Sequence, residues 1–156
     1  MKVTSTAIVN GLIQDEYGKF GQNFIDDMPS YSMPFQIVDA PKGTVSYAVI
    51  LDDKDSVPVC GFVWVHWLVA NLKKETVVAN ESVSDTADFV QGNNSWNEPL
   101  YGGMAPPDKD HVYDLTVYAL DKELSLQNGF SLTELESQMD GHILASYCLQ
   151  GKYRAF

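Results

Sequence analysis

Positive charge is scarce in this sequence. Lysine and arginine number 10 against 21 aspartate and glutamate residues, which gives a formal net charge of −11. Such a charge repels the phosphate backbone of nucleic acids and the head groups of anionic bilayers. We therefore expect no nucleic-acid partner, and an anionic ligand would have to be held by a local cluster of hydrogen-bond donors.

Long hydrophobic runs are also missing. No stretch approaches the roughly 20 apolar residues that a membrane-spanning helix needs, and residues 1–20 hold no apolar segment typical of a signal peptide. These absences predict a cytoplasmic protein without stable membrane insertion.

Cysteine is limited to Cys60 and Cys148, which lie far apart and are flanked by apolar residues. Neither has the spacing of a redox motif or of a metal site. We expect two buried free thiols, no metal and no cofactor.

What remains is an ordinary globular composition, 45% hydrophobic and 20% charged over 156 residues, which predicts a single domain over residues 1–156. Strand-like segments cover 45–51, 62–70, 111–120 and 143–153. One helix is expected to begin at Ser131, where Glu134 completes a capping box. Many short strands and one late helix predict an all-β fold with minor α, arranged as an antiparallel β-sandwich.

Polar side chains stand at the ends of three predicted strands, where apolar packing does not require them. They are Asp53 and Asp55 after the first strand, His66 within the second, and His111 and Tyr113 at the start of the third. Each alone is weak support for a site, because acidic turns are usually solvated. Their coincidence is what indicates one.

His66 is the single polar residue in its apolar strand. Strand alternation places it on the face of Trp64 and Leu68, with Trp67 on the other face. A lone histidine in such a strand is more often a satisfied core residue than a ligand-binding one. If it is mostly desolvated, its ring nitrogens need partners.

Five groups of residues occur together in a combination more specific than any single motif. They are Ser32-Met33-Pro34 with residues 41–46, Asp53-Lys54-Asp55-Ser56, the segment 66–71 (HWLVAN), residues 101–107 (YGGMAPP) with His111-Val112-Tyr113, and residues 141–145 with 151–154. This combination, over residues 30 to 154, resembles the phosphatidylethanolamine-binding protein family, and specifically its small bacterial branch, often called Raf kinase inhibitor-like proteins. The sequence departs from the family's pattern at Lys54, Ser56, Ala105 and Val112, where proline, alanine, glycine and arginine are usual.

The resemblance implies two antiparallel sheets in a sandwich with Greek-key connections, and a pocket for phosphate, acetate or phosphoryl head groups. Carried over position by position, the pocket contains Asp53, Asp55, His66, Ala105, Pro106, His111 and Tyr113. The two histidines and the tyrosine are expected to donate hydrogen bonds to an oxyanion. Because a free histidine titrates near ~6.5, we expect anion binding to strengthen as the pH falls.

We interpret the protein as a binding or regulatory module for a small anionic ligand, either a phosphate, a phosphoryl head group or a carboxylate. The resemblance adds a protein partner such as a kinase, and a homodimer. One alternative is a hydrolase that uses an Asp–His pair as general base. The sequence has no G-x-S-x-G motif and no metal-ligand spacing, which favours a binder over an enzyme. A third interpretation is a protein-contact module that uses an exposed aromatic residue such as Trp96 or Phe156.

Overall fold

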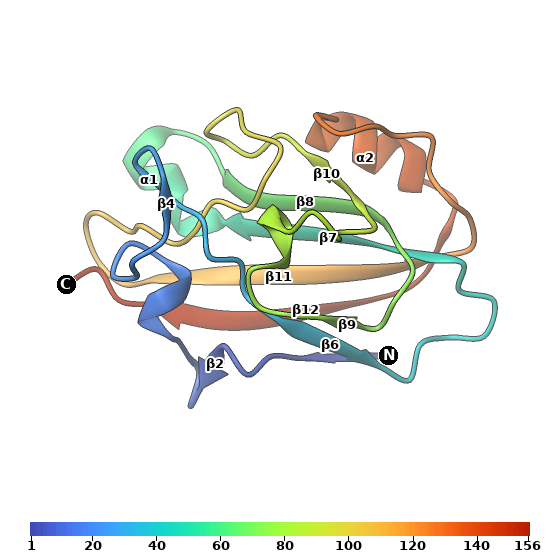
Figure 1. Cartoon of the computed structure of the whole chain (residues 1–156), viewed down its shortest axis with the longest axis horizontal. Coiled ribbons are helices and arrows are strands. Elements are labelled where there is room, and N and C mark those ends of the chain that lie inside the picture. Colours follow the sequence, from blue (N-terminus) through green and yellow to red (C-terminus); the bar gives the residue numbers. More distant parts are fainter.

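The computed structural model describes all 156 residues and is built around one curved, seven-stranded sheet (Figure 1). The strand order is β10-β8-β7-β11-β12-β3-β2. The bounds of these strands, in the same order, are Val90–Gly92, Trp64–Leu72, Ser46–Asp53, His111–Leu120, Ile143–Tyr153, Leu12–Ile13 and Ile8–Val9. The long strands β7, β8, β11 and β12 match the four segments expected from the sequence, to within two residues at nearly every end.

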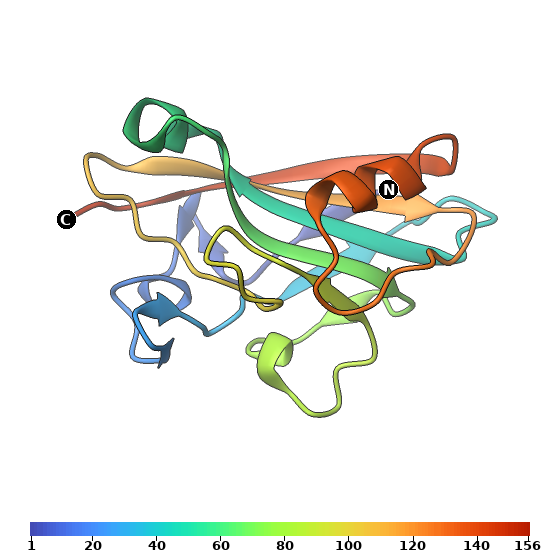
Figure 2. The same ribbon diagram turned by 90° about the horizontal axis from the view of Figure 1, so that it is seen from above.

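Smaller elements cover both faces of this main sheet (Figure 2). On one face lies a three-stranded antiparallel sheet of β1 (Lys2–Thr4), β6 (Phe35–Val38) and β9 (Thr76–Val77), with the hairpin β4 (Phe24–Ile25) and β5 (Met28–Pro29) nearby. On the other face lies α2 (Leu132–Met139). The short helix α1 (Val57–Cys60) follows β7, and 3-10 turns occupy Asp15–Tyr17, Lys54–Ser56 and Glu81–Val83.

The core lies on both sides of the main sheet. On β7, Val49 and Leu51 belong to a cluster of 22 buried residues that also includes side chains of β1, β6 and β9. The neighbouring residues Ala48 and Ile50 face a second cluster of 10 buried residues, to which α2 contributes Leu135. Because both faces are covered, the central strands have continuous apolar sequences rather than an alternating pattern.

The capping box expected at Ser131 is confirmed. The Ser131 hydroxyl accepts from the Glu134 amide at 3.1 Å, and the Glu134 carboxylate accepts from the Ser131 amide at 2.9 Å. Leu135 and Met139 of α2 are buried, so the predicted apolar face of the helix does contact the sheet.

The predicted fold class is correct as a mostly β fold with little helix, but three details differ. The main sheet is mixed rather than antiparallel, because β12 pairs in parallel with β3 at Lys152 and Leu12, and the Greek-key sandwich is not confirmed. The second helix, α1, was not expected. The prediction of buried thiols is wrong, since Cys60 on α1 and Cys148 on the outer face of β12 are both exposed.

A β-bulge in β8 decides where His66 points. Leu51 of β7 lies opposite Trp67, whereas the next residue, Asp52, lies opposite Val65. β8 therefore has one residue more than β7 between these pairs, and that residue is His66.

The bulge changes the face on which the neighbours of His66 lie. Trp67 packs in the larger cluster and Leu68 in the smaller one. The His66 ring lies 5.2 Å from the ring of Tyr113 on β11. Simple alternation, which grouped His66 with Leu68 and set Trp67 on the opposite face, is wrong here because the inserted residue shifts the period.

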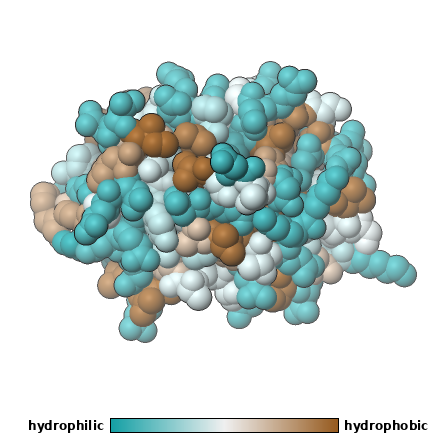
Figure 3. Space-filling model, viewed as in Figure 1, coloured by the Kyte–Doolittle hydropathy of each residue, from teal (hydrophilic) through white to brown (hydrophobic).

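The surface on the side viewed in Figure 1 is mainly hydrophilic, and its hydrophobic residues form separate groups rather than one continuous patch (Figure 3). No helix of the chain has both the length and the apolar character needed to cross a membrane.

Candidate functional site

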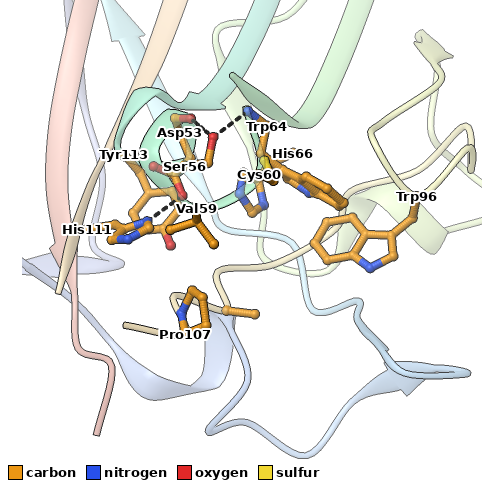
Figure 4. A pocket seen from close by; sticks show the side chains of 11 residues that line it. Asp53, Ser56, Val59, Cys60, Trp64, His66, Trp96, Pro107, His111 and Tyr113 are labelled. Carbon is orange, nitrogen blue, oxygen red and sulfur yellow. Dashed lines mark hydrogen bonds and ion pairs between the residues drawn. The ribbon is translucent and has the colours of Figure 1, made fainter. Parts of the chain in front are cut away.

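A pocket of about 260 Å³ opens at one end of the main sheet, where β7 ends and β11 begins. In Figure 4, His111 and Tyr113 lie on one side of it, Trp96 lies on the other, and Pro107 closes a third side. Its wall is formed by Asp53, Ser56, Val59, Cys60, Trp64, His66, Trp96, Ala105, Pro107, His111 and Tyr113.

Strand register brings the polar groups of this wall together. Asp53 is the last residue of β7, and it lies opposite Trp64 on β8 and opposite Tyr113 on β11. The Asp53 side chain is only 5% exposed. Because β7 lies between β8 and β11, a carboxylate at its end is next to both neighbouring strands.

His111 is bonded to two carboxylates. Its Nδ1 lies 2.7 Å from Oδ2 of Asp53, and its Nε2 lies 2.7 Å from Oδ1 of Asp108. A carboxylate oxygen accepts hydrogen bonds, so both ring nitrogens donate when the imidazole is cationic. Burial alone lowers the pKa of His111, but the bonds to the two carboxylates outweigh it and raise the pKa above its ordinary value.

His66 has the opposite protonation behaviour. Its Nδ1 lies 2.7 Å from the carbonyl oxygen of Gly102, which can only accept, so Nδ1 carries the proton. Complete burial lowers the pKa of His66 to about 4, although the Gly102 carbonyl and the charge of Asp53 act against this. His66 is therefore neutral near pH 7, and its Nε2 is an acceptor.

The expectation that both histidines donate to an oxyanion is wrong in this geometry. Both nitrogens of His111 already donate to carboxylates, and neutral His66 offers the pocket an acceptor. The hydroxyl of Tyr113 remains a donor, because burial and the nearby Asp53 charge raise its pKa.

Two buried polar atoms of the wall lack any protein partner. One is Oδ1 of Asp53, an acceptor, and the other is Nε1 of Trp64, a donor. The third such atom in the chain, Oε2 of Glu81, lies 2.5 Å from Nζ of Lys74. Buried polar atoms without a partner are rare in folded proteins, so two of opposite kind in one pocket wall indicate a place where a ligand or an ordered water can bind.

Ser56 fixes this part of the wall. Its Oγ lies 2.6 Å from the Asp53 carbonyl and 2.7 Å from the Phe62 carbonyl, and it accepts from the Trp64 amide at 2.9 Å. The hydroxyl therefore joins the end of β7 to the start of β8 across the intervening α1.

The structure brings five of the seven predicted site residues into one wall: Asp53, His66, Ala105, His111 and Tyr113. Asp55 and Pro106 lie outside it. Asp55 accepts from the Val112 amide at 2.9 Å, and the carbonyl of buried Pro106 accepts from Nζ of Lys19 at 2.6 Å. Pro107 takes the wall position expected of Pro106.

Several wall residues were not predicted from the sequence. Trp64 could have been, because it lies two residues before His66 and alternation had already placed it on the same face. Trp96 was considered as an exposed residue for contact with another protein, but its ring lies 5.5 Å from that of His66. The bond from Asp108 to His111 depends on the path of a loop, for which the sequence contains no periodic signal.

The hydrolase alternative finds no support in this geometry. Asp53 and His111 do form an Asp–His pair, but Asp108 occupies the second ring nitrogen, so the imidazole has no free position from which to act as a base. The one serine of the wall, Ser56, is engaged with the backbone.

Comparison with known proteins gives a consistent assignment. The family described as phosphatidylethanolamine-binding protein matches residues 4–154. The Bacillus subtilis protein YxkA is 39% identical, over 90% of this chain and 93% of its own length. A UPF0098 protein of Methanothermobacter thermautotrophicus is 31% identical, over 90% of this chain and 93% of its own.

Solved structures show the same fold. The phosphatidylethanolamine-binding protein homologue CT736 from Chlamydia trachomatis is 32% identical with a TM-score of 0.84, covering 98% of this chain and 96% of that one. Escherichia coli YbcL, at 24% identity, has a TM-score of 0.83 and covers 98% and 97% of the two chains. These matches confirm the resemblance found in the motifs, and this chain belongs to the phosphatidylethanolamine-binding protein family.

Proposed function

We propose that this protein is a binding module for a small organic oxyanion that still carries a proton, with a phosphate monoester as the best fit, and that occupancy of the site regulates a protein partner. The observation that carries this proposal is the pair of unpartnered buried atoms in one wall, Oδ1 of Asp53 and Nε1 of Trp64. A ligand that satisfies both must accept one hydrogen bond and donate another.

A partly protonated phosphate group meets this requirement. Its ionised oxygens accept from the Trp64 indole and the Tyr113 hydroxyl, and its remaining P–OH donates to Asp53 or to Nε2 of His66. The second pKa of a phosphate monoester is about 6, so a substantial part of the ligand keeps this proton near neutral pH. A fully deprotonated anion would set an acceptor against an acceptor in a poorly solvated pocket.

The size of the pocket supports a ligand larger than inorganic phosphate. Its volume of about 260 Å³ far exceeds the roughly 10–15 Å³ that a cavity needs to hold one water molecule, whereas a phosphate ion has five non-hydrogen atoms. The remaining wall is largely apolar and includes Val59, Trp96 and Pro107. The ester substituent therefore needs a small apolar part.

The regulatory half of the proposal is supported by family membership and by the lack of a free catalytic base at His111. The family resemblance alone supports a kinase as the kind of partner and a homodimer as the assembly.

A matched pair of ligands tests the proposal. Methyl phosphate monoanion and methyl sulfate have the same shape and charge, but only the former has a hydroxyl. At pH 6 we expect calorimetry to give at least about tenfold tighter binding of methyl phosphate, which corresponds to one hydrogen bond to a charged group of roughly 1.5 kcal/mol. Dimethyl phosphate, which also lacks the hydroxyl, should resemble methyl sulfate.

Two variants test whether Asp53 causes the preference for methyl phosphate over methyl sulfate. Asp53→Asn should narrow or reverse it, because an amide can donate to sulfate. Asp55→Asn removes the same charge just outside the wall and should leave it unchanged. Equal affinity for the two ligands in the unmodified protein, or an equal effect of both substitutions, would contradict the proposal.

A further inference from the structure

Asp108 contacts the site only through His111. Its Oδ1 lies 2.7 Å from Nε2 of His111, but the Asp108 side chain is 45% exposed and is not part of the pocket wall. His111 is itself only 1% exposed and is part of that wall. Asp108 therefore reaches the pocket indirectly, through a buried ring.

The two bonds of His111 are needed together. A cationic imidazole has two N–H donors, and a buried donor without an acceptor costs free energy. Asp53 satisfies Nδ1 alone. With no acceptor at Nε2, the neutral ring would be favoured in this buried position, because burial disfavours the charged form.

We propose that Asp108 is a positioning residue for the anion site: by accepting from Nε2 it holds His111 as a cation in the pocket wall, with Nδ1–H fixed on Asp53. This inference rests on the proposed function, because it concerns how the same pocket holds an anion. Asp108 would then support anion binding although it is itself negative, since its charge stands behind the ring and outside the wall.

The other titratable groups around His111 do not replace Asp108. They are Asp53 on β7, His66 on β8, Tyr113 on β11, and Tyr153 opposite His111 on β12. His66 is neutral, and the raised pKa values of Tyr113 and Tyr153 keep both phenols uncharged. Asp53 and Asp108 are thus the two negative groups bonded to this imidazole.

Replacing Asp108 separates this proposal from simple charge repulsion. If Asp108 acts only as a negative charge near an anion site, Asp108→Asn should tighten anion binding at every pH. If it positions His111, the substitution lowers the pKa of His111, and the pocket wall loses its cation above that lower value. Binding should then weaken at high pH and recover at low pH, where His111 is protonated again.

The experiment measures methyl phosphate affinity from pH 5 to 8 for the unmodified protein and for Asp108→Asn. At each pH, the affinity of the unmodified protein is divided by that of Asp108→Asn, and this ratio cancels the ionisation of the ligand. We expect Asp108→Asn to bind more weakly in the pH window between its own lowered His111 pKa and the raised His111 pKa of the unmodified protein. The loss there should be about tenfold, the size of one contact to a charged group. The ratio should fall to one or below at pH 5.

Two further variants serve as controls. Asp108→Glu keeps a carboxylate and should restore most of the affinity lost in that pH window. Asp110→Asn removes the same charge from the same loop, but the Asp110 carboxylate accepts from the Ala155 amide and is not one of the two carboxylates bonded to the His111 ring. The ratio of the affinity of the unmodified protein to that of Asp110→Asn should not vary with pH.

Nitrogen NMR of the imidazole rings tests the proposal without any ligand. As the pH rises, both His111 nitrogens of the unmodified protein should keep the shifts of protonated nitrogen to a higher pH than in Asp108→Asn, where one nitrogen should move earlier to the value of an unprotonated nitrogen. An unchanged His111 spectrum, or tighter binding by Asp108→Asn throughout, overturns the inference. If the unmodified protein binds no methyl phosphate, the proposed function fails, while the NMR result still decides the role of Asp108.

Discussion

The depressed pKa of His66 predicts how the stability of this protein depends on pH. In the folded state His66 is fully buried and binds a proton only near pH 4, whereas in the unfolded chain it binds one near 6.5. As the pH falls through 6.5, the His66 imidazole binds a proton in the unfolded state but stays neutral in the folded state. Stability is therefore lost between about pH 6.5 and 4, with no further loss from this group below 4.

The magnitude follows from the same two values. At about 1.4 kcal/mol per pKa unit, the interval from 6.5 to about 4 corresponds to roughly 3 kcal/mol of unfolding free energy. This is a large share of the 5–15 kcal/mol that stabilises a typical domain. His111 acts in the opposite direction, since its raised pKa gives stability that is present below 6.5 and lost as the pH rises through the folded value.

The assay compares urea unfolding of the unmodified protein and of His66→Gln at pH 7 and pH 4. Glutamine does not titrate, and its amide can still donate to the Gly102 carbonyl. His66→Gln should be less stable at pH 7, because the ring leaves a gap, but its disadvantage should shrink by about 3 kcal/mol at pH 4. All other titrating groups are common to both proteins. A stability difference that stays constant between the two pH values would refute the assigned burial and protonation of His66.

Two other features of the pocket wall give measurable expectations. Ser56→Ala should lower the unfolding free energy by about 1–3 kcal/mol in a urea titration, because the part-buried Trp64 amide loses its acceptor. An unchanged midpoint and slope would show that water replaces the hydroxyl. Cys60 is exposed at the pocket wall whereas Cys148 is exposed on β12, so maleimide should block methyl phosphate binding in Cys148→Ser but not in Cys60→Ser. Equal inhibition of both variants would mean that modification acts away from the pocket.

The sequence was most informative where the pattern of apolar residues is compatible with only one kind of secondary structure. Apolar runs identified β7 and β8, alternation identified β11, and antiparallel pairing of their ends is enough to bring Asp53 near Tyr113. The bulge at His66 was not predictable in this way. In a strand that is apolar on both faces, a shift of one residue exchanges one apolar side chain for another and leaves no trace in the pattern.

The protonation states of the two histidines could not be predicted from the sequence either. His66 and His111 are the same residue type at two strand ends, and both were expected to be cationic donors. Burial makes His66 neutral, and two carboxylates raise the pKa of His111 and so favour its cationic form. The second carboxylate belongs to Asp108, whose loop position is set by tertiary packing rather than by local propensity.

The charge of the site explains how an acidic protein could select among anions. Asp53, His111 and Asp108 carry a formal charge of −1 together when His111 is protonated, and neutral His66 adds nothing. The net charge of these groups therefore does not attract an anion in a protein already at −11, and the His111 cation supports binding only by offsetting one of the two carboxylates. What remains is the match of donors to acceptors, which gains strength in a pocket of low dielectric constant. Under the proposed function, such a site would reject chloride and sulfate, which bring no proton, and would accept a protonated phosphate ester, so its selectivity and its negative charge would have the same origin.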